Sequence, residues 1–165
     1  MKFGQGWSSY FPVLIKTVQN TDGPILELGS GLFSTPLLHW LCAEQGRKLV
    51  TYEDVQEYYK FARKFRTETH EVNFVTDWDK EDFDKKKWSV VLIDHTAKRR
   101  TTDALRLKKH AQYIVLHDTQ EEAEHHYGYK KLWSKFKNIY HWEYDLVNVP
   151  RTSVVSNTSN LNIFK

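Results

Sequence analysis

Four residues that could move a proton or hold a cation stand in two adjacent pairs. Asp94 and His95 directly follow the apolar run WSVVLI, and His117 and Asp118 directly follow the apolar run YIVL. Imidazole and carboxylate groups are common acids and bases in enzymes, and carboxylate oxygens also suit a hard cation such as Mg²⁺. We therefore treat all four as candidate catalytic residues, and Asp94 and Asp118 also as candidate metal ligands.

A glycine-containing stretch earlier in the chain could hold a ligand. The segment ELGSGLFSTP begins at Glu27, inside a short apolar run, and places Gly29 and Gly31 before an amphipathic segment. Glycine lets a backbone approach a ligand closely, and the start of a helix favours anionic groups. This layout is how a strand passes into a helix through a ligand-binding loop, although the same glycines could form a tight turn that binds nothing.

The apolar periodicity predicts strands and helices that alternate along the chain. The predicted strands span residues 25–28, 48–52, 71–76, 88–93, 113–116 and 138–146, and the predicted helices span 10–19, 36–45, 55–65, 101–109 and 120–137. The polar stretch 79–87 is expected to be a solvated loop or short helix, and the tail 151–165 a hairpin or a pair of strands. Such alternation implies a parallel sheet covered by helices on both faces.

Polar residues stand at the ends of the predicted strands. Ligands of parallel α/β folds bind at the carboxyl ends of the strands, so a succession of polar strand ends favours a binding edge over a series of ordinary turns. The residues concerned are Glu27, Glu53, Asp77, the pair Asp94 and His95, and the pair His117 and Asp118. We expect one ligand site at this edge of the sheet.

The composition is that of an ordinary folded protein. The 165 residues are 40% hydrophobic and 27% charged, which predicts one domain over residues 1–165, with residues 1–20 as a helical segment that packs on it. The single cysteine, Cys42, excludes an internal disulfide and favours a reducing compartment. Without a long apolar run or a secretory signal, we expect a cytoplasmic protein that does not contact a membrane. The net charge of +3 permits nucleic acid as a partner without favouring it.

These features resemble class I S-adenosylmethionine-dependent methyltransferases, and the resemblance of order and spacing extends from Ile25 to the end of the chain. It rests on the ELGSG stretch, on Glu53 at the end of the second strand, on Asp77 and Trp78 after the third, and on Asp94 at the end of the fourth. It implies a Rossmann-like three-layer α/β sandwich whose seven-stranded sheet is mostly parallel, with an antiparallel C-terminal strand. Adenosylmethionine is the cofactor that the resemblance implies.

The resemblance also assigns roles to individual residues. The glycine loop would approach the methionine part of the cofactor, the acid after the second strand would bind both ribose hydroxyls, and the pair after the third strand would flank the adenine. The cofactor-binding residues implied in this way are Glu27, Gly29, Ser30, Gly31, Ser34, Thr35, Glu53, Asp77 and Trp78. One departure is Phe33, which stands where many family members have a third glycine.

A nicotinamide-dependent oxidoreductase, which would bind NAD(P), is the nearest competing class. Such proteins also have Gly-x-Gly after a strand and an acidic residue further on. The segment GSGLFS lacks their final glycine, and Glu27 fits the methyltransferase pattern better. A relative that binds or degrades adenosylmethionine without methylating stays open, because the chain is short for the family. The same brevity favours a small or open acceptor site, or one completed by a second subunit in a homodimer.

The residues after the fourth strand bear on the methyl acceptor. Nucleic-acid enzymes of this class that methylate amino groups usually carry an Asn/Asp-Pro-Pro-aromatic signature there, whereas this chain has IDHTAKRR, so base methylation is disfavoured. A nucleic-acid enzyme would use basic pairs such as Lys108-Lys109 and Lys130-Lys131. Acidic residues at strands four and five instead resemble small O-methyltransferases of the catechol and macrocin type, in which they hold Mg²⁺. We expect methylation of a hydroxyl on a small molecule or saccharide, with Mg²⁺ as an optional cofactor.

Without a metal, a histidine could take the hydroxyl proton. His95 and His117 both lie at the predicted edge, and imidazole titrates near neutral pH. Either could instead hydrogen-bond the end of its strand. His125 and His126 are weaker candidates, since adjacent histidines on a helix are more often surface or packing residues.

Two further groups have two interpretations each. The run Lys98-Arg99-Arg100 could bind a phosphate, a carboxylate or a sugar acid, or it could be the solvated start of the next helix. Trp7, in the segment GWSS, could fold over the cofactor or seal the core. The sequence does not decide between these interpretations.

Overall fold

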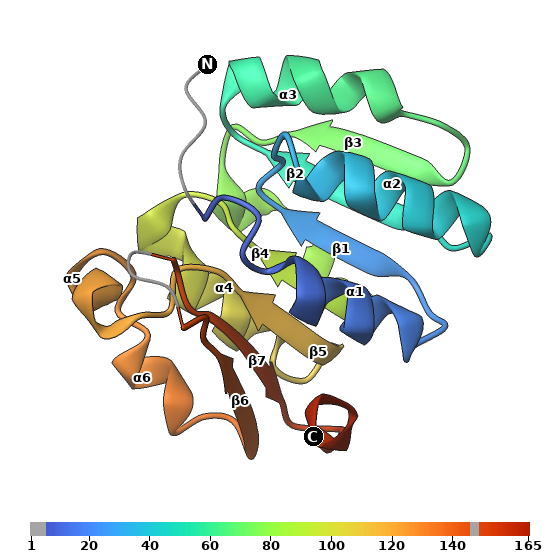
Figure 1. The fold of residues 1–165 in the computed structure, drawn as a ribbon. Helices are drawn as coiled ribbons and strands as arrows, with labels where there is room; N and C mark the ends of the chain where they lie inside the picture. Colours follow the sequence, from blue (N-terminus) through green and yellow to red (C-terminus); the bar gives the residue numbers. More distant parts are fainter. Residues whose placement is uncertain (1–5, 146–148) are drawn as a thin grey trace.

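The computed structural model describes residues 6–145 and 149–165 of the chain. At its centre is one seven-stranded sheet in the order β3-β2-β1-β4-β5-β7-β6 (Figure 1). The strands are β1 (Ile25–Leu28), β2 (Leu49–Glu53), β3 (His70–Phe74), β4 (Trp88–Ile93), β5 (Ala111–Leu116), β6 (Asn138–Trp142) and β7 (Thr152–Ser156). The six strands predicted over residues 25–146 are therefore all present, although residue 146 itself lies outside the described residues.

The strand directions confirm the predicted fold class. β1 to β5 pair in parallel, and β7 pairs antiparallel with both β5 and β6. β6 therefore runs with the parallel strands, and β7 is the reversed one. The usual dinucleotide-binding sheet has the order 3-2-1-4-5-6, so a reversed strand inserted between β5 and β6 departs from the nicotinamide-binding arrangement.

Helices cover both faces of the sheet and complete three layers (Figure 1). They are α1 (Phe11–Gln19), α2 (Ser34–Glu44), α3 (Gln56–Ala62), α4 (Arg100–Leu107), α5 (Glu124–Tyr127) and α6 (Lys130–Trp133). Residues of α1 and α2 pack into one hydrophobic core, and residues of α4 and α6 pack into the other. Within the described residues, no helix has both the length and the apolar character needed to cross a membrane.

Side chains of the central strands alternate between the two cores. Ile25 belongs to the core under α1 and α2, whereas Leu26 and Leu28 belong to the core under α4 and α6. All four residues of β1 are buried, as expected for a strand covered on both faces. The same alternation directs Glu27 toward the side of α2, which decides its role in the site.

The predicted helix over residues 120–137 is wrong in its extent. Gly128 has a φ of +67° and ends α5, and α6 begins two residues later. Glycine adopts positive φ without steric cost and commonly ends helices in this way. Tyr129 and Leu132 are buried as their spacing suggested, but Leu132 belongs to a second, short helix and Tyr129 is the residue that precedes it.

The predicted hairpin over residues 151–165 is also wrong. β7 is followed by a single turn of 3-10 helix, Asn162–Phe164, and no further strand forms in the described residues. The Ser156 side chain accepts hydrogen bonds from two backbone N–H groups of the intervening turn. Phe164 then stacks on Tyr140 of β6, with ring centroids 4.7 Å apart. This apolar contact ends the chain on the face of the sheet instead of along its edge.

Candidate active site

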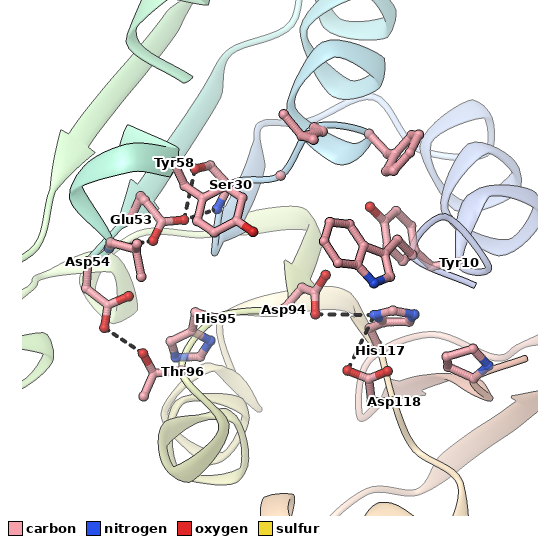
Figure 2. A pocket seen from close by; sticks show the side chains of 16 residues that line it. Tyr10, Ser30, Glu53, Asp54, Tyr58, Asp94, His95, Thr96, His117 and Asp118 are labelled. Carbon is pink, nitrogen blue, oxygen red and sulfur yellow. Dashed lines mark hydrogen bonds and ion pairs between the residues drawn. The ribbon is translucent and has the colours of Figure 1, made fainter. Parts of the chain in front are cut away.

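A pocket of about 420 Å³ lies at the carboxyl ends of β1, β2, β4 and β5 (Figure 2). This volume is within the range of small-molecule sites. Side chains from distant parts of the sequence line it: Trp7, Tyr10, Ser30, Gly31, Leu32, Phe33, Glu53, Asp54, Val55, Tyr58, Asp94, His95, Thr96, His117, Asp118 and Pro150. The predicted binding edge is therefore a real concavity.

The glycine turn brings β1 against the end of β4. Gly29 has a φ of +91°, and a Cβ atom on it would lie 2.5 Å from the backbone nitrogen of His95. No other residue type fits there, because both the backbone conformation and the space require glycine. Gly31 and Ser30 then line the pocket.

Glu53, at the end of β2, supports the glycine turn and faces the pocket. Its Oε2 accepts hydrogen bonds from the backbone nitrogen of Ser30 at 2.7 Å and from the Ser30 hydroxyl at 2.9 Å, and its Oε1 accepts one from Val55 N at 2.7 Å. Burial raises the pKa of Glu53, and these hydrogen bonds act against the rise. A carboxylate has about four lone-pair positions, so one remains for a ligand hydroxyl.

Glu27 does not reach the pocket, which corrects its expected contact with the cofactor. Its side chain is fully buried under α2, where it accepts hydrogen bonds from the hydroxyls of Thr35 and Thr51. The Thr35 hydroxyl in turn accepts a bond from the backbone nitrogen of Gly31. Ser34 and Thr35 are likewise buried at the start of α2. These residues support the loop from behind, because strand side chains point across the sheet and not along it.

Asp77 and Trp78 also lie outside the pocket lining, which corrects their expected place beside the adenine. Asp77 accepts a hydrogen bond from the backbone nitrogen of Asp79 and pairs with Lys80 at the surface. Trp78 is buried, with its ring centroid 4.4 Å from that of His95. The short 3-10 turn that begins at Trp78 carries both side chains away from the sheet edge.

Residues in the segment after β2 line the pocket, although the sequence analysis did not single them out. Asp54, Val55 and Tyr58 line the pocket beside Glu53. Asp54 Oδ2 accepts hydrogen bonds from the Trp78 indole at 3.0 Å and from the Thr96 hydroxyl at 2.6 Å, which joins the loops after β2 and β4. Their position just after Glu53 was the signal in the sequence that could have identified them.

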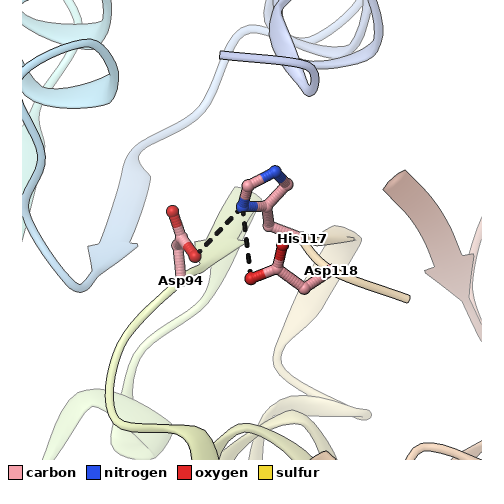
Figure 3. A group of neighbouring side chains, drawn as sticks. All are labelled: Asp94, His117 and Asp118. Atoms are coloured by element: carbon pink, nitrogen blue, oxygen red, sulfur yellow. Dashed lines mark hydrogen bonds and ion pairs between the residues drawn. The ribbon is translucent and has the colours of Figure 1, made fainter. Parts of the chain in front are cut away.

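Asp94, His117 and Asp118 converge on the other side of the pocket (Figure 3). His117 Nδ1 lies 3.3 Å from Asp94 Oδ1 and 3.6 Å from Asp118 Oδ2. His117 Nε2 lies 3.0 Å from the hydroxyl of Ser9, so both ring nitrogens are engaged. Asp118 has a φ of +56°, a left-handed conformation that aspartate tolerates better than most residues.

The charges of this group stabilise one another. Burial by itself would lower the pKa of His117, but the carboxylates of Asp94 and Asp118 overcome that effect and raise it. Burial would raise the pKa of Asp94, but His117 and Arg100 hold it below its ordinary value. Both ring nitrogens of His117 are engaged with neighbouring groups, so His117 is not a free base.

His95 is held in a separate buried pair. Its Nε2 lies 2.9 Å from Asp103 Oδ2, and both side chains have no exposed surface. Burial lowers the pKa of His95 despite the neighbouring carboxylate of Asp103. His95 lines the pocket, but its ring is tied to Asp103 and its lowered pKa makes it a weaker base than a free imidazole, so the prediction that it acts as a base gains no support from this geometry.

The group Asp94, His117 and Asp118 could form a metal site by distance alone, since one ligand atom from each lies within 4.8 Å of the others. The position of Arg100 argues against a metal ion here, because its guanidinium already contacts both carboxylates. Its Nη2 is 2.8 Å from Asp94 Oδ1, and its Nη1 is 3.0 Å from Asp118 Oδ2. Mg²⁺ prefers six oxygen ligands and would have to share these carboxylates with a buried positive charge. The residues do not fit Mg²⁺, and the expected metal at Asp94 and Asp118 is not supported.

The remaining candidate residues differ in their burial and in whether they line the pocket. In the run Lys98-Arg99-Arg100, Lys98 is exposed, Arg99 pairs with Asp79 and Asp103, and only Arg100 is buried beside the site. His125 and His126 are exposed on α5 and do not line the pocket. Trp7 and Phe33 both line it, so Trp7 lies over the site and not in the core.

Tyr10 was not among the predicted site residues, and Arg100 was predicted only as part of a basic run. Tyr10 is almost fully buried, lines the pocket, and packs its ring edge-on against His117 with centroids 4.9 Å apart. Only the docking of α1 against the end of β5 brings them together. Arg100 had a visible signal, because it follows Asp94 by a few residues and could reach both acidic strand ends.

Comparison with known proteins rests on structure. No family model and no curated protein matches the sequence. The N-terminal domain of human METTL16 in complex with SAH is 12% identical, with a TM-score of 0.63 over 96% of this chain and 73% of that one. Cofactor-bound Rv0187 from MTB is 16% identical, with a TM-score of 0.67 over 96% and 83%. An O-methyltransferase from Bacillus cereus in complex with SAH is 15% identical, with a TM-score of 0.64 over 94% and 82%.

The chain has the fold of class I S-adenosylmethionine-dependent methyltransferases. In this methyltransferase fold, the pocket described above occupies the carboxyl edge of the sheet, where α/β folds bind their ligands. At 12% to 16% sequence identity, the likeness to these proteins is one of architecture.

Proposed function

We propose that this protein transfers a methyl group from S-adenosylmethionine to a hydroxyl oxygen of a small molecule or saccharide. The observation that carries the proposal is a single pocket that unites the glycine turn after β1, the acid at the end of β2 and the carboxylates after β4 and β5. The shared fold with SAH-bound proteins supports the cofactor. The absence of the amino-methylation signature after β4 supports an oxygen acceptor.

The two sides of the pocket suggest separate tasks (Figure 2). In the proposal, Gly31 gives the ligand close access to the loop, and Glu53 accepts a hydrogen bond from a ribose hydroxyl through its remaining lone pair. Asp54, Val55 and Tyr58 flank the adenine. The acceptor then lies on the side of Asp94 and Asp118.

Asp94 is the residue to which we assign the hydroxyl proton. When bound, adenosylmethionine supplies a methyl group on a sulfonium, and its transfer to a hydroxyl oxygen releases one proton that a residue must take. Asp94 Oδ1 is held by Arg100 and His117, whereas Oδ2 has no hydrogen-bond partner among the described residues. The Asp94 side chain lines the pocket, so its second oxygen is available to an acceptor hydroxyl.

Calorimetric titration with S-adenosylmethionine, S-adenosylhomocysteine and NAD tests the cofactor. We expect heat of binding with the first two and none with NAD. Binding of NAD alone would show that the protein is an oxidoreductase of similar architecture. The absence of binding heat with both S-adenosylmethionine and S-adenosylhomocysteine would refute the proposal.

Replacement of Asp94 tests the proposed base. Asp94→Asn should lower the release of S-adenosylhomocysteine in the presence of a hydroxyl acceptor by about 100-fold or more, the usual effect of a missing acid or base. Cofactor affinity should stay the same, because Asp94 lies on the acceptor side. Asp79→Asn, at an exposed acid outside the pocket, is the matched control. Equal activity in the two variants would exclude Asp94 as the base.

A nucleic-acid acceptor is less well supported. Lys108 and Lys109 line a separate hollow of about 380 Å³ together with Lys135 and Lys137, and it shares no residue with the proposed active site. Salt-dependent binding of RNA or DNA would reverse this ranking.

A homodimer that completes the acceptor site stays part of the proposal, and light scattering at several protein concentrations would detect it.

A further inference from the structure

A buried arginine joins the two carboxylates of the proposed acceptor side. The Arg100 side chain is 8% exposed, and its two terminal nitrogens contact different acids, Asp94 at 2.8 Å and Asp118 at 3.0 Å. The guanidinium therefore spans the ends of β4 and β5. An exposed ion pair contributes little to stability, because water weakens the attraction between its charges. This ion pair is largely buried and so is shielded from water.

The other N–H groups of Arg100 are also engaged. Nε donates to the carbonyl of His95 at 2.7 Å, Nη1 to the carbonyl of His117 at 3.3 Å, and Nη2 to the carbonyl of Asp94 at 3.3 Å. An arginine has five N–H donors, and four of them make hydrogen bonds here, three to carbonyls and one to Asp118, while Nη2 also lies in ion-pair contact with Asp94 Oδ1. Arg100 is therefore not free to bind a phosphate or carboxylate of a substrate.

Two tyrosines complete its surroundings. The Tyr127 ring lies 4.4 Å from the guanidinium carbon, and the Tyr127 hydroxyl donates to Asp118 Oδ2 at 3.0 Å. The Tyr129 hydroxyl donates to the carbonyl of His117 at 3.0 Å. A planar cation in contact with an aromatic face and two carboxylates has one well-defined position.

We propose that Arg100 is a built-in cation that takes the place of a divalent metal ion at this edge and positions Asp94 and Asp118 for a reaction that needs no metal. The link to methyl transfer rests on the proposed function, whereas the claim about the cation does not. Arg100 is a positioning residue, because it acts through the two carboxylates and does not line the pocket.

The proposal predicts that a metal site appears when Arg100 is removed. Without the guanidinium, two carboxylates and an imidazole remain within 4.8 Å of one another and partly buried. Two partly buried carboxylates that share only the His117 ring repel each other, and a divalent cation with oxygen and nitrogen ligands relieves that cost. A purely structural arginine would simply destabilise the protein when removed, with no new affinity for ions.

Calorimetric titration of Mg²⁺ and Mn²⁺ tests this directly, without cofactor or acceptor. Wild type should show no binding, and Arg100→Ala should bind Mn²⁺ at least tenfold more tightly than wild type. The double variant with Arg100→Ala and Asp118→Asn is the matched control and should lose the new site, because asparagine also tolerates the left-handed backbone at this position. Equal Mn²⁺ affinity in wild type and Arg100→Ala would overturn the proposal.

Two further measurements cover the case in which Arg100→Ala does not fold. Wild type can be titrated with Mn²⁺ alone and compared with Asp118→Asn, and Mn²⁺ binding to wild type that this change abolishes would overturn the proposal. Arg100→Lys keeps a positive charge and should fold without binding Mn²⁺. Failure of adenosylmethionine to bind would refute the proposed function and leave these ion measurements unaffected.

Discussion

At the scale of single residues, Glu53 is the side chain on which the cofactor side of the pocket depends. It joins the glycine turn to the end of β2 and offers one lone pair to a ligand. Glu53→Ala should weaken adenosylmethionine binding by about 1.5 to 3 kcal/mol, the range for hydrogen bonds to charged groups. Titration calorimetry measures this change.

Asp77→Ala is the informative control for that experiment. The resemblance placed Asp77 beside the adenine, whereas the structure places it at the surface and outside the pocket. We therefore expect cofactor affinity within about 0.5 kcal/mol of wild type, as for other surface substitutions. A loss as large as that of Glu53→Ala would return Asp77 to the site.

Glu27 is buried, and its protonation should affect stability. Burial raises its pKa from the ordinary value of 4.5 to about 7 in the folded protein. A carboxyl group with a higher pKa when folded stabilises the protein while it is protonated, and this stabilisation is lost as the pH rises from the unfolded pKa to the folded one. Glu27→Gln removes the loss, because glutamine does not titrate.

The expected result is a pH-dependent difference from wild type. Between about pH 5 and about pH 8, the stability of Glu27→Gln relative to wild type should improve by up to about 3 kcal/mol, measured by urea unfolding. The stability of the variant has to be compared with that of wild type at each pH, because a second group also titrates. Burial lowers the pKa of His70 to about 4, which makes stability rise with pH and so opposes the effect of Glu27. A constant difference between the two proteins would contradict the raised pKa.

At the scale of elements, the passage from β1 to α2 requires glycine at one position in particular. Gly29 and Gly46 both have positive φ, but only at Gly29 would a Cβ atom collide with a neighbouring backbone. Gly29→Ala should cost about 3 kcal/mol or more, whereas Gly46→Ala should cost about 1 kcal/mol from its backbone conformation alone. Thermal or urea unfolding of the pair measures this, and equal costs would mean that β1 and β4 can separate at this point.

The same scale explains why the last helix was predicted as one piece. The apolar residues on both sides of Gly128 keep a helical spacing, so their periodicity does not show the break. The left-handed glycine ends α5, and Tyr127, the last residue of that helix, packs against Arg100.

At the scale of the whole molecule, residues distant in the sequence close the acceptor side of the pocket. Ser9 hydrogen-bonds His117, and Tyr144 donates a hydrogen bond to the carbonyl of Ser9 at 3.2 Å. The N-terminal segment, the end of β5 and the connection after β6 therefore meet at one place. Ser9 is more than one hundred residues away in the sequence from both His117 and Tyr144, so only tertiary packing could reveal these contacts.

The sequence by itself determined the sheet and the location of the site. Apolar runs that alternate with helical spacing are local signals, and parallel strands bring their carboxyl ends to one edge, so Glu53, Asp94 and Asp118 could be assigned to that edge from spacing alone.

The tertiary structure decided which of those residues face the pocket and what state they are in. Glu27 lies under α2 because strand side chains alternate between the faces of the sheet. Asp77 lies outside the pocket because a short turn begins there, and Arg100 lies between two carboxylates. These outcomes depend on how strands, loops and helices pack against one another in space. A single sequence shows the spacing of residues along the chain but not the charge or hydrogen bond that will lie opposite each of them.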